Sequence, residues 1–404
     1  MTNKYGITKV PYEWEHRKKY LQLPFPQSEY DRRIAGLRQA MSKNGMSYLL
    51  IYSNPACTGP VIYIANYDSF FGNTIVMIPV SGEPSLITDG IMHSEPMHSA
   101  IWTTWIKDIR PTSHPATVRH AQNISDFVVD QLKRWGVQNS KGGLVNMNFS
   151  PFTFMQRLTD LLPEINLLPA DRLFEQVRAI KSDLEIAMLR KTAKMSSLGL
   201  NRVFEIDSQG MTEKELAAEA VHTFLAAGSD SPMIALTAGP RSGLKHAPPT
   251  EYKIKNGDML FVDVSTPYQG YMSDVARSGV VGVASRQQVE MLETALEMHD
   301  RVIEAIKPGA RICDLQKIAE DIANRRGLGD YYFPTGFGHG IGTSIAETPI
   351  LFPDNEAPLE RNMVFALEPM IVIEGVGTAV FEEMILVTET GHEVLSDATV
   401  STWK

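Results

Sequence analysis

Two aspartates interrupt an apolar stretch that has the pattern of a β-hairpin. Residues 259–281, MLFVDVSTPYQGYMSDVARSGVV, form two strand-like arms around a turn, and the arms carry Asp263 and Asp274. If the hairpin closes symmetrically about Tyr268 and Gln269, the aspartates lie opposite each other, with β-carbons about 4.5–5.5 Å apart. Two half-buried carboxylates at that distance share a proton or bind a cation. Because a solvent-exposed pair would cost little, the hairpin alone leaves both a site and an exposed surface open.

Three further segments place acidic or imidazole groups among small or apolar residues. His339 lies among glycines in TGFGHGIG, Glu368 is embedded in FALEPMIV, and Glu382 and Glu383 are embedded in AVFEEMILV. Glycines allow the backbone to come close to a metal or a substrate, because no side chain stands in the way. Each of these residues alone has an ordinary structural explanation, whereas the set indicates a site.

Carboxylates together with one imidazole are a donor set for hard or borderline divalent cations such as Mn²⁺, Co²⁺, Fe²⁺ or Zn²⁺. Four carboxylates carry the charge that two such cations neutralise, so a binuclear centre explains the set with no residual buried charge. The two cysteines, Cys57 and Cys313, lie far apart in the chain, which argues against a Cys-ligated zinc and a disulfide framework.

The order of these residues resembles the pita-bread superfamily, which includes aminopeptidase P, prolidase, methionine aminopeptidase and creatinase. Asp263 is followed eleven residues later by Asp274, then by His339, by Glu368 before a proline, and by Glu382. The resemblance implies that Asp263 chelates one metal, that Asp274 and Glu382 bridge both, and that His339 and Glu368 complete the other. It also implies a metal-activated water as the nucleophile, with Glu368 as its proton acceptor.

Two more residues match positions of the same superfamily. His246, in ALTAGPRSGLKHAPP, falls on a site histidine that contacts the substrate or donates a proton to the intermediate. Without the resemblance, a lone histidine there would be interpreted as a loop-capping residue. Arg277, three residues after Asp274, fits the SD-x-x-R pattern and is expected to support the hairpin. In FEEMILV the resemblance favours Glu382 over Glu383 as the ligand.

Other positions depart from the peptidases of the superfamily. A second site histidine, seven residues after the metal histidine, is replaced by Ala346; an arginine before the last glutamate is Val380, and a tyrosine after Glu-Pro is Val372. The metal ligands are kept while the peptide-handling positions change, which favours hydrolysis of an amide-type C–N bond in a small zwitterionic molecule. An Xaa-Pro dipeptidase or aminopeptidase is one alternative. A metal-assisted lyase resembling the dimethylsulfoniopropionate enzyme is the other.

Substrate contacts are expected from two further segments. Glu347, in TSIAETP, either contacts a cationic substrate group or is an exposed turn residue. Phe70 and Phe71, in NYDSFFG, either line the site or pack as a hairpin tip. In relatives with this layout the N-terminal domain of one subunit reaches over the active site of the other. The resemblance therefore implies a homodimer, with residues 67–71 or the region around His93 contributing to the partner's site.

The second half of the chain combines long helices with runs of strands. Its first two helices open on capping signals, Ser182 with Glu185 and Thr212 before a helix that Gly228 closes. Helices are predicted at residues 177–206, 211–228, 285–306 and 311–327, and strands at residues 231–239, 259–281, 335–342, 362–373 and 379–391. This pattern predicts an α+β fold, and the resemblance implies a pita-bread catalytic domain over residues 173–404.

The first half has the alternating strands and helices of an α/β domain. A helix is predicted at residues 28–45, with Ser28 as its N-cap and Gly45 at its end, before a buried strand at residues 47–53. The resemblance implies a creatinase-type N-terminal domain over residues 1–172.

Composition and charge narrow the classes of function. With 404 residues, 43% of them hydrophobic, the chain can bury two cores. A net charge of −9 with scattered acidic residues gives no basic surface for nucleic acid or an anionic membrane. No stretch reaches the ~18 apolar residues of a membrane-spanning helix, and the N-terminal residues lack a signal-peptide pattern. We therefore expect a cytoplasmic protein that acts on a small molecule or dipeptide and binds neither nucleic acid nor membrane.

Overall fold

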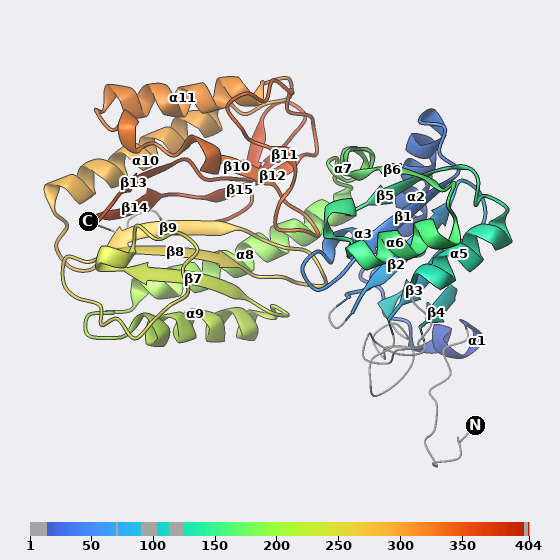
Figure 1. The fold of residues 1–404 in the computed structure, drawn as a ribbon. Coiled ribbons are helices and arrows are strands. Elements are labelled where there is room, and N and C mark those ends of the chain that lie inside the picture. The colour runs from blue at the N-terminus through green and yellow to red at the C-terminus, as the bar shows by residue number, and fades with distance from the viewer. Residues whose placement is uncertain (1–13, 70–71, 90–102, 113–123, 400–402, 404) are drawn as a thin grey trace, which may run out of the picture. The chain divides into compact units, whose positions relative to one another are not determined.

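Two compact units make up the protein, and a computed structural model describes its residues 14–69, 72–89, 103–112, 124–399 and 403 (Figure 1). The units comprise Met1–Arg178 and Ala179–Lys404. The predicted boundary after residue 172 falls inside helix α7 (Asp171–Arg178). Because α7 buries Leu173 and Phe174 and packs against α2 (Gln27–Lys43), the whole helix belongs to the first unit.

A six-stranded mixed sheet forms the centre of the first unit, with strand order β4-β3-β2-β1-β5-β6. Strand β1 pairs antiparallel with β2 and parallel with β5. All residues of β1 and β2 are buried, which explains their continuous apolar sequences YLLIYS and TIVMIP. The strands are β1 (Tyr48–Ser53), β2 (Thr74–Pro79), β3 (Ser85–Thr88), β4 (Asp108–Pro111), β5 (Lys141–Val145) and β6 (Asn166–Pro169).

Helices surround this sheet, and an apolar core that includes Leu50, Met77 and Leu132 lies between them. Besides α2 and α7 they are α1 (Trp14–Arg17), α3 (Gly59–Ala65), α5 (Ile124–Trp135) and α6 (Phe152–Leu161). The predicted N-cap of α2 at Ser28 is wrong. The helix begins at Gln27, so the N-cap is Pro26, two residues before Ser28. The Pro26 ring fixes φ near −65° and lets the chain enter the helix without a side-chain cap.

The strands of the second unit lie between two pairs of helices (Figure 1). Helices α8 (Asp183–Glu205) and α9 (Glu213–Ala227) pack against the sheet β7-β8-β9. Helix α10 (Arg286–Ala305) packs against β13 and β14, and α11 (Ile312–Arg325) packs against α10. This arrangement confirms the predicted α+β fold. The strands occur in runs between and after the long helices, and the helices pack against the sheets that these strands form.

Three sheets share the core of the second unit, with orders β7-β8-β9, β13-β14 and β11-β10-β12-β15-β16. The strands are β7 (Met233–Ala238), β8 (Met259–Ser265), β9 (Val275–Val280), β10 (Gly338–Gly340), β11 (Glu347–Ile350), β12 (Val364–Leu367), β13 (Met370–Ile373), β14 (Gly377–Val380), β15 (Glu383–Val387) and β16 (His392–Val394).

Capping boxes start three of the four long helices of the second unit. The box predicted at Ser182 is confirmed, because the Ser182 side chain accepts from the backbone N–H of Glu185. The predicted cap at Thr212 is also confirmed, and it forms a box with Glu215. Ser285 caps α10 in the same way with Gln288. These caps fix where each helix starts.

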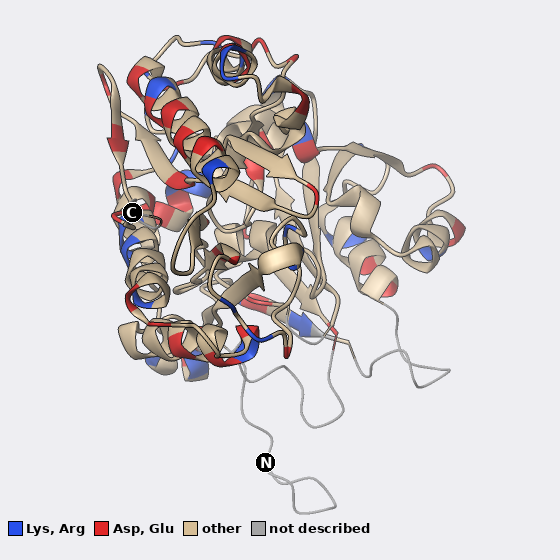
Figure 2. Ribbon diagram, turned by 90° about the vertical axis from the view of Figure 1, so that its left-hand side faces the viewer, with Lys and Arg blue, Asp and Glu red and all other residues tan. Residues whose placement is uncertain are grey.

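Charges of both signs are interspersed along the helices (Figure 2). Ion pairs such as Arg286 with Glu290 on α10 follow this pattern. Cys57 and Cys313 are free thiols. Among the described helices, none has the length and apolar character needed to cross a membrane.

Candidate metal centre

Strands β8 and β9 form the predicted hairpin with a register that differs from the predicted one. Asp263 pairs with Ala276, so the expectation that Asp263 and Asp274 lie directly opposite each other is wrong. Asp274 instead lies just before the first residue of β9, outside the paired ladder. A diagonal arrangement in place of a direct pair leaves room between the two carboxylates.

The position of the turn causes the shift in register. Tyr268 and Tyr271 form the closing bridge, with backbone hydrogen bonds of 2.9 and 3.0 Å in the two directions. The two central residues are then Gln269 (φ 49°) and Gly270 (φ 83°), both in the left-handed region. A two-residue turn of this kind requires positive φ at both central positions, which glycine adopts without strain. The turn therefore includes Gly270 and excludes Tyr268.

Buried hydroxyl groups hold the hairpin on helix α8 next to Asp274. The Oγ of Ser273 lies 2.7 Å from the Oγ of Ser196 and 2.8 Å from the Oγ1 of Thr266, and it accepts the backbone N–H of Thr266 at 2.8 Å. The Thr266 hydroxyl in turn donates to the carbonyl of Thr192 on α8. All four hydroxyl residues are buried, so the backbone at Asp274 is anchored from two sides.

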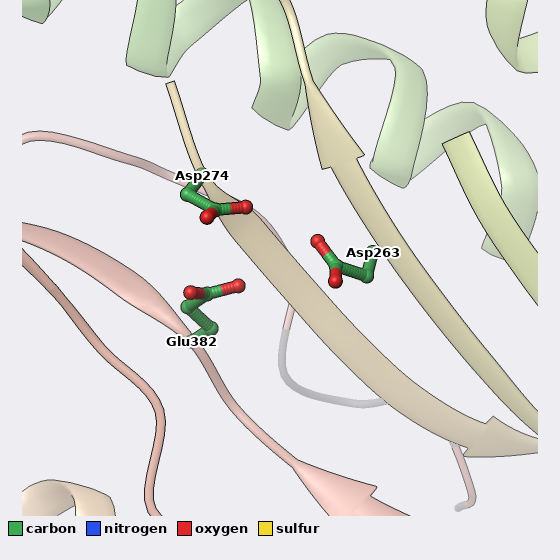
Figure 3. A group of neighbouring side chains, drawn as sticks. All are labelled: Asp263, Asp274 and Glu382. Atoms are coloured by element: carbon green, nitrogen blue, oxygen red, sulfur yellow. The ribbon is translucent and has the colours of Figure 1, made fainter. Parts of the chain in front are cut away.

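Three carboxylates from different segments meet beside the hairpin. Ligand atoms of Asp263, Asp274 and Glu382 all lie within 4.8 Å of one another, and their side chains point toward one another (Figure 3). The backbone N–H of Glu382 donates to the carbonyl of Ala276 at 3.0 Å, which fixes Glu382 against β9. The site thus combines two residues of the hairpin with one from a segment more than a hundred residues later.

Glu383, the neighbour of Glu382, lies away from the three carboxylates. Its carboxylate is buried and accepts hydrogen bonds from Arg277 and Ser396. The Arg277 guanidinium also donates to the carbonyl of Glu382 and to that of Ala398. Arg277 therefore supports the hairpin, in agreement with its expected role, and only Glu382 faces the two aspartates.

His339 and Glu368 approach the carboxylates from the neighbouring sheet. The Nε2 of His339 lies 3.4 Å from Oδ2 of Asp274 and 3.9 Å from Oε1 of Glu368. The Nδ1 of His339 lies 3.1 Å from the carbonyl oxygen of Gly340. Because a carbonyl only accepts, that bond assigns the proton to Nδ1 and leaves the lone pair of Nε2 directed at the carboxylates.

Glycines beside His339 allow strands to approach it closely. A β-carbon on Gly338 would lie 2.2 Å from the carbonyl oxygen of Ala366, and one on Gly340 would lie 2.4 Å from that of Thr348. The pairing of β10 with β11 and β12 therefore requires glycine at both positions. The sequence signal GHG thus reflects close strand packing around the histidine.

Burial and mutual repulsion disfavour ionisation of the carboxylates. Burial, and then the charge of Asp274, raises the pKa of Glu368 to about 8. Burial followed by the charge of Asp263 raises the pKa of Asp274 well above its usual value, and burial followed by Asp274 does so for Glu382. Divalent cations would remove this repulsion, so the donor set fits two such ions in number, type and charge.

His246 lies on the loop after β7 and reaches the same group. Its Nε2 lies 3.4 Å from Oδ2 of Asp263, and its side chain is 74% exposed. The hydrogen bond to Asp263 raises the pKa of His246. The residue has a φ of 58°, so the backbone turns in the left-handed region to direct the imidazole inward. The structure thus brings His246 to the predicted acidic residues.

A cavity of about 550 Å³ opens in front of these side chains, entirely within the second unit. All five predicted ligands and His246 line it. The rest of the wall is largely apolar and includes Ile345, Phe333 and Met370, and one charged residue in it, Lys245, was missed by the sequence analysis. Its only sequence signal is its place directly before His246 in GLKHAPP.

Glu347 does not contact this cavity, so its predicted role toward a cationic substrate group is wrong. It is 3% exposed and pairs with Lys181 at 2.9 Å, and it accepts the backbone N–H of Ser344. The lysine lies just before α8, far from Glu347 in sequence, so the short motif TSIAETP gives no sign of the pair. Phe70, Phe71 and His93 lie outside the described residues.

Known protein families account for both units. Residues 187–389 match the model of Metallopeptidase family M24, and residues 33–180 match that of the Creatinase/Prolidase N-terminal domain. The chain belongs to metallopeptidase family M24. As an M24 protein with an attached Creatinase/Prolidase N-terminal domain, it is a metallohydrolase of the pita-bread superfamily, as the sequence predicted. M24 enzymes use divalent metal ions, in agreement with the predicted type of cofactor.

Individual relatives match this M24 chain over between about half and nine-tenths of its length. An Xaa-Pro dipeptidase of Pyrococcus horikoshii is 26% identical over 370 residues, which cover 91% of this chain and 97% of the relative. An Xaa-Pro dipeptidase of Pyrococcus furiosus is 32% identical over 228 residues, 56% of this chain and 65% of the relative. The structure of an Xaa-Pro dipeptidase from Bacillus anthracis superposes with a TM-score of 0.79 and 27% identity, covering 92% and 98% of the two chains.

Proposed function

We propose that this M24 protein hydrolyses the amide bond of dipeptide-sized substrates, with Xaa-Pro dipeptides as the leading class. The observation that carries the proposal is the convergence of Asp263, Asp274 and Glu382, beside His339 and Glu368, on one cavity wall. The names of the Pyrococcus and Bacillus relatives support the choice of substrate.

We assign the five residues to two divalent ions. Asp263, Asp274 and Glu382 would supply oxygen ligands to these ions, and His339 and Glu368 would supply the remaining ones. The 3.4 and 3.9 Å distances from His339 Nε2 to Asp274 and Glu368 support this assignment. Oxygen donors with one imidazole suit Mn²⁺, Co²⁺, Fe²⁺ or Zn²⁺.

When bound, the ions would polarise the scissile carbonyl and make a water nucleophilic near neutral pH. Glu368, on the cavity wall, would accept a proton from the attacking water. His246, which is held by Asp263 and largely exposed to the cavity, donates a hydrogen bond to the oxygen or nitrogen that gains charge. The apolar wall around Ile345, Phe333 and Met370 packs against the substrate's side chain and excludes water.

A second candidate is a small amide that is not a dipeptide. It is favoured by the changed positions Ala346, Val372 and Val380, of which Val380 is buried in an apolar cluster with Phe261, Ala276 and Met370. The lyase alternative has no support beyond the same donor set, and we do not propose it.

The test is turnover by metal-loaded protein on a panel of Xaa-Pro dipeptides, Xaa-Ala dipeptides and N-acyl amines, with Asp274→Ala as the inactive control. Asp354→Ala, at an exposed position outside the cavity, serves as the matched acidic control. Cleavage of Xaa-Pro dipeptides by the wild type and Asp354→Ala proteins, and not by Asp274→Ala, is expected. Cleavage of the N-acyl amines alone would replace the leading class with the second candidate.

Two further features stay predictions, the cytoplasmic location and the homodimer. We propose the dimer because the resemblance to two-domain members of the superfamily implies it. Tyr67, at the start of the segment considered for this contact, is buried and its hydroxyl lies 3.1 Å from that of Thr88. Light scattering at micromolar concentration tests the proposal, and a mass near the chain's 45.0 kDa would contradict it.

A further inference from the structure

One positive charge remains on the cavity wall when the charges of the centre are balanced. Two divalent ions neutralise the four carboxylates of Asp263, Asp274, Glu368 and Glu382. Among the described residues that line the cavity, Lys245 is the one lysine or arginine. A loaded cavity therefore presents a surplus positive charge to whatever enters it, because no acidic group is left to offset the ammonium.

The ammonium of Lys245 is held by an aromatic ring. Its Nζ lies 2.9 Å from the centroid of the Phe333 ring, and within the described chain it forms no ion pair. Burial lowers the pKa of Lys245 to about 8, against the opposing influence of the Glu368 charge. A partly buried ammonium on an aromatic face keeps N–H groups available, so an incoming anion would relieve its loss of hydration.

The remaining wall offers nothing to a cationic substrate group. Glu347, the acidic residue closest in sequence to the cavity loop at Ile345, is buried against Lys181. Other wall residues, such as Met233, Ser265 and Thr335, are uncharged. The cavity thus combines an apolar surface with a single lysine or arginine. Such a surface favours substrates that carry an anionic group over those that do not.

We propose that Lys245 is the specificity-determining residue of this enzyme and binds the free carboxylate of the substrate. The substrate class is then a small amide with a carboxylate beside the scissile bond, such as the C-terminal carboxylate of a dipeptide. Since Lys245 directly precedes His246, the carboxylate lies on the side of the cavity where His246 meets the scissile bond. This inference rests on the proposed amide hydrolysis.

The test compares Ala-Pro with Ala-Pro-amide, which share the scissile bond and differ in whether the C-terminal group is an anionic carboxylate or a neutral amide. Wild-type protein is expected to have a kcat/KM for Ala-Pro that exceeds that for the amide by roughly 10- to 100-fold, as a charge-assisted hydrogen bond would provide. Lys245→Met keeps the apolar stem and should abolish the preference by lowering kcat/KM for Ala-Pro toward the value for the amide. Lys245→Arg should retain most of it, and Lys255→Met, at an exposed lysine, should behave as wild type.

Binding separates this inference from the proposed function. Calorimetry with metal-loaded protein is expected to show proline binding at least about tenfold more tightly than prolinamide, with the difference lost in Lys245→Met, or in Lys245→Gln if the Met variant unfolds. If neither dipeptide is cleaved but this difference appears, the peptidase proposal fails and the role of Lys245 stands. Equal binding of proline and prolinamide by the wild type, or an unchanged preference in both variants, would overturn it.

Discussion

Two kinds of buried charge lie side by side in the second unit. Glu383 faces Arg277, and Glu347 faces Lys181, so each of these carboxylates has a cation in the folded chain. Asp274 and Glu382 face other carboxylates, and burial with repulsion raises the pKa of both. The first kind holds strands together, whereas the second lacks charge balance until cations bind.

The contrast shows how two adjacent residues, at the start of β15, serve function and structure. Glu382 and Glu383 are neighbours and therefore point to opposite sides of the chain, one toward the aspartates and the other toward Arg277. Removing a matched charge leaves its partner unpaired and destabilises the fold. Removing an unmatched charge should spare the fold and damage only metal binding.

Glu382→Gln is expected to cause the largest loss. Activity should fall by about 1,000-fold or more, because losing several kcal/mol of transition-state stabilisation slows a reaction tenfold for each ~1.4 kcal/mol. The metal-free variant should melt no lower than the metal-free wild type, since the substitution removes a buried repulsive charge. Steady-state kinetics and calorimetric melting measure the two effects. A clear drop in the melting temperature would contradict the distinction between carboxylates that are paired with a cation and carboxylates that are not.

Glu383→Gln should have the opposite effect. It leaves the buried guanidinium of Arg277 without its carboxylate, which costs about 3–5 kcal/mol of unfolding free energy. Metal content should stay at the wild-type level while the protein remains folded. Urea unfolding of Glu382→Gln and Glu383→Gln under identical conditions compares their free energies of unfolding. A Glu383→Gln protein that stays stable but loses its metal would reverse the assignment of the two glutamates.

The stability of the metal-free protein should fall as the pH rises. The pKa of Glu368 is about 8 in the folded chain and about 4.3 in an unfolded one. Between these values the folded protein binds the extra proton, so the free energy of unfolding decreases with pH and levels off above about 8. Metal-loaded protein should not show this decline. Melting temperatures from pH 5 to 9 with and without chelator measure it, and parallel curves would contradict the unmatched-charge account.

Ser196→Ala should produce the smallest change. It removes one hydroxyl from the network beside Asp274, with an expected cost of about 1 kcal/mol and a weakening of metal affinity of roughly tenfold. Ser197→Ala is the matched control, because the neighbouring hydroxyl bonds to Ala193 and Asp397, away from the hairpin. Metal titration should distinguish the two variants, and equal affinities would show that the network does not position Asp274.

The site residues that could be predicted from the sequence are those that differ in chemistry from the residues around them. Asp263, Asp274 and Glu382 stand out in apolar stretches of the sequence, and His339 stands out among glycines, so no long-range information was needed to select them. The capping boxes at Ser182 and Thr212 depend on residues three apart and were likewise predictable.

Features that depend on distant contacts or on backbone conformation were not predictable. The hairpin register follows from the left-handed pair Gln269 and Gly270, which alternation of apolar residues does not reveal. The burial of Glu347 requires Lys181, which meets it only through the fold. Lys245 has no motif of its own, and its relevance depends on the cavity that the strands enclose.

Metal stoichiometry tests the central claim most directly. Elemental mass spectrometry on protein purified without chelator, beside Asp274→Ala, should give about two divalent ions per chain in the wild type, as four carboxylates and one imidazole can hold, and a clear loss in the variant. If the wild type carries no metal and takes up none on titration with Mn²⁺, Co²⁺, Fe²⁺ or Zn²⁺, the account of the unmatched carboxylates as a binuclear centre is wrong.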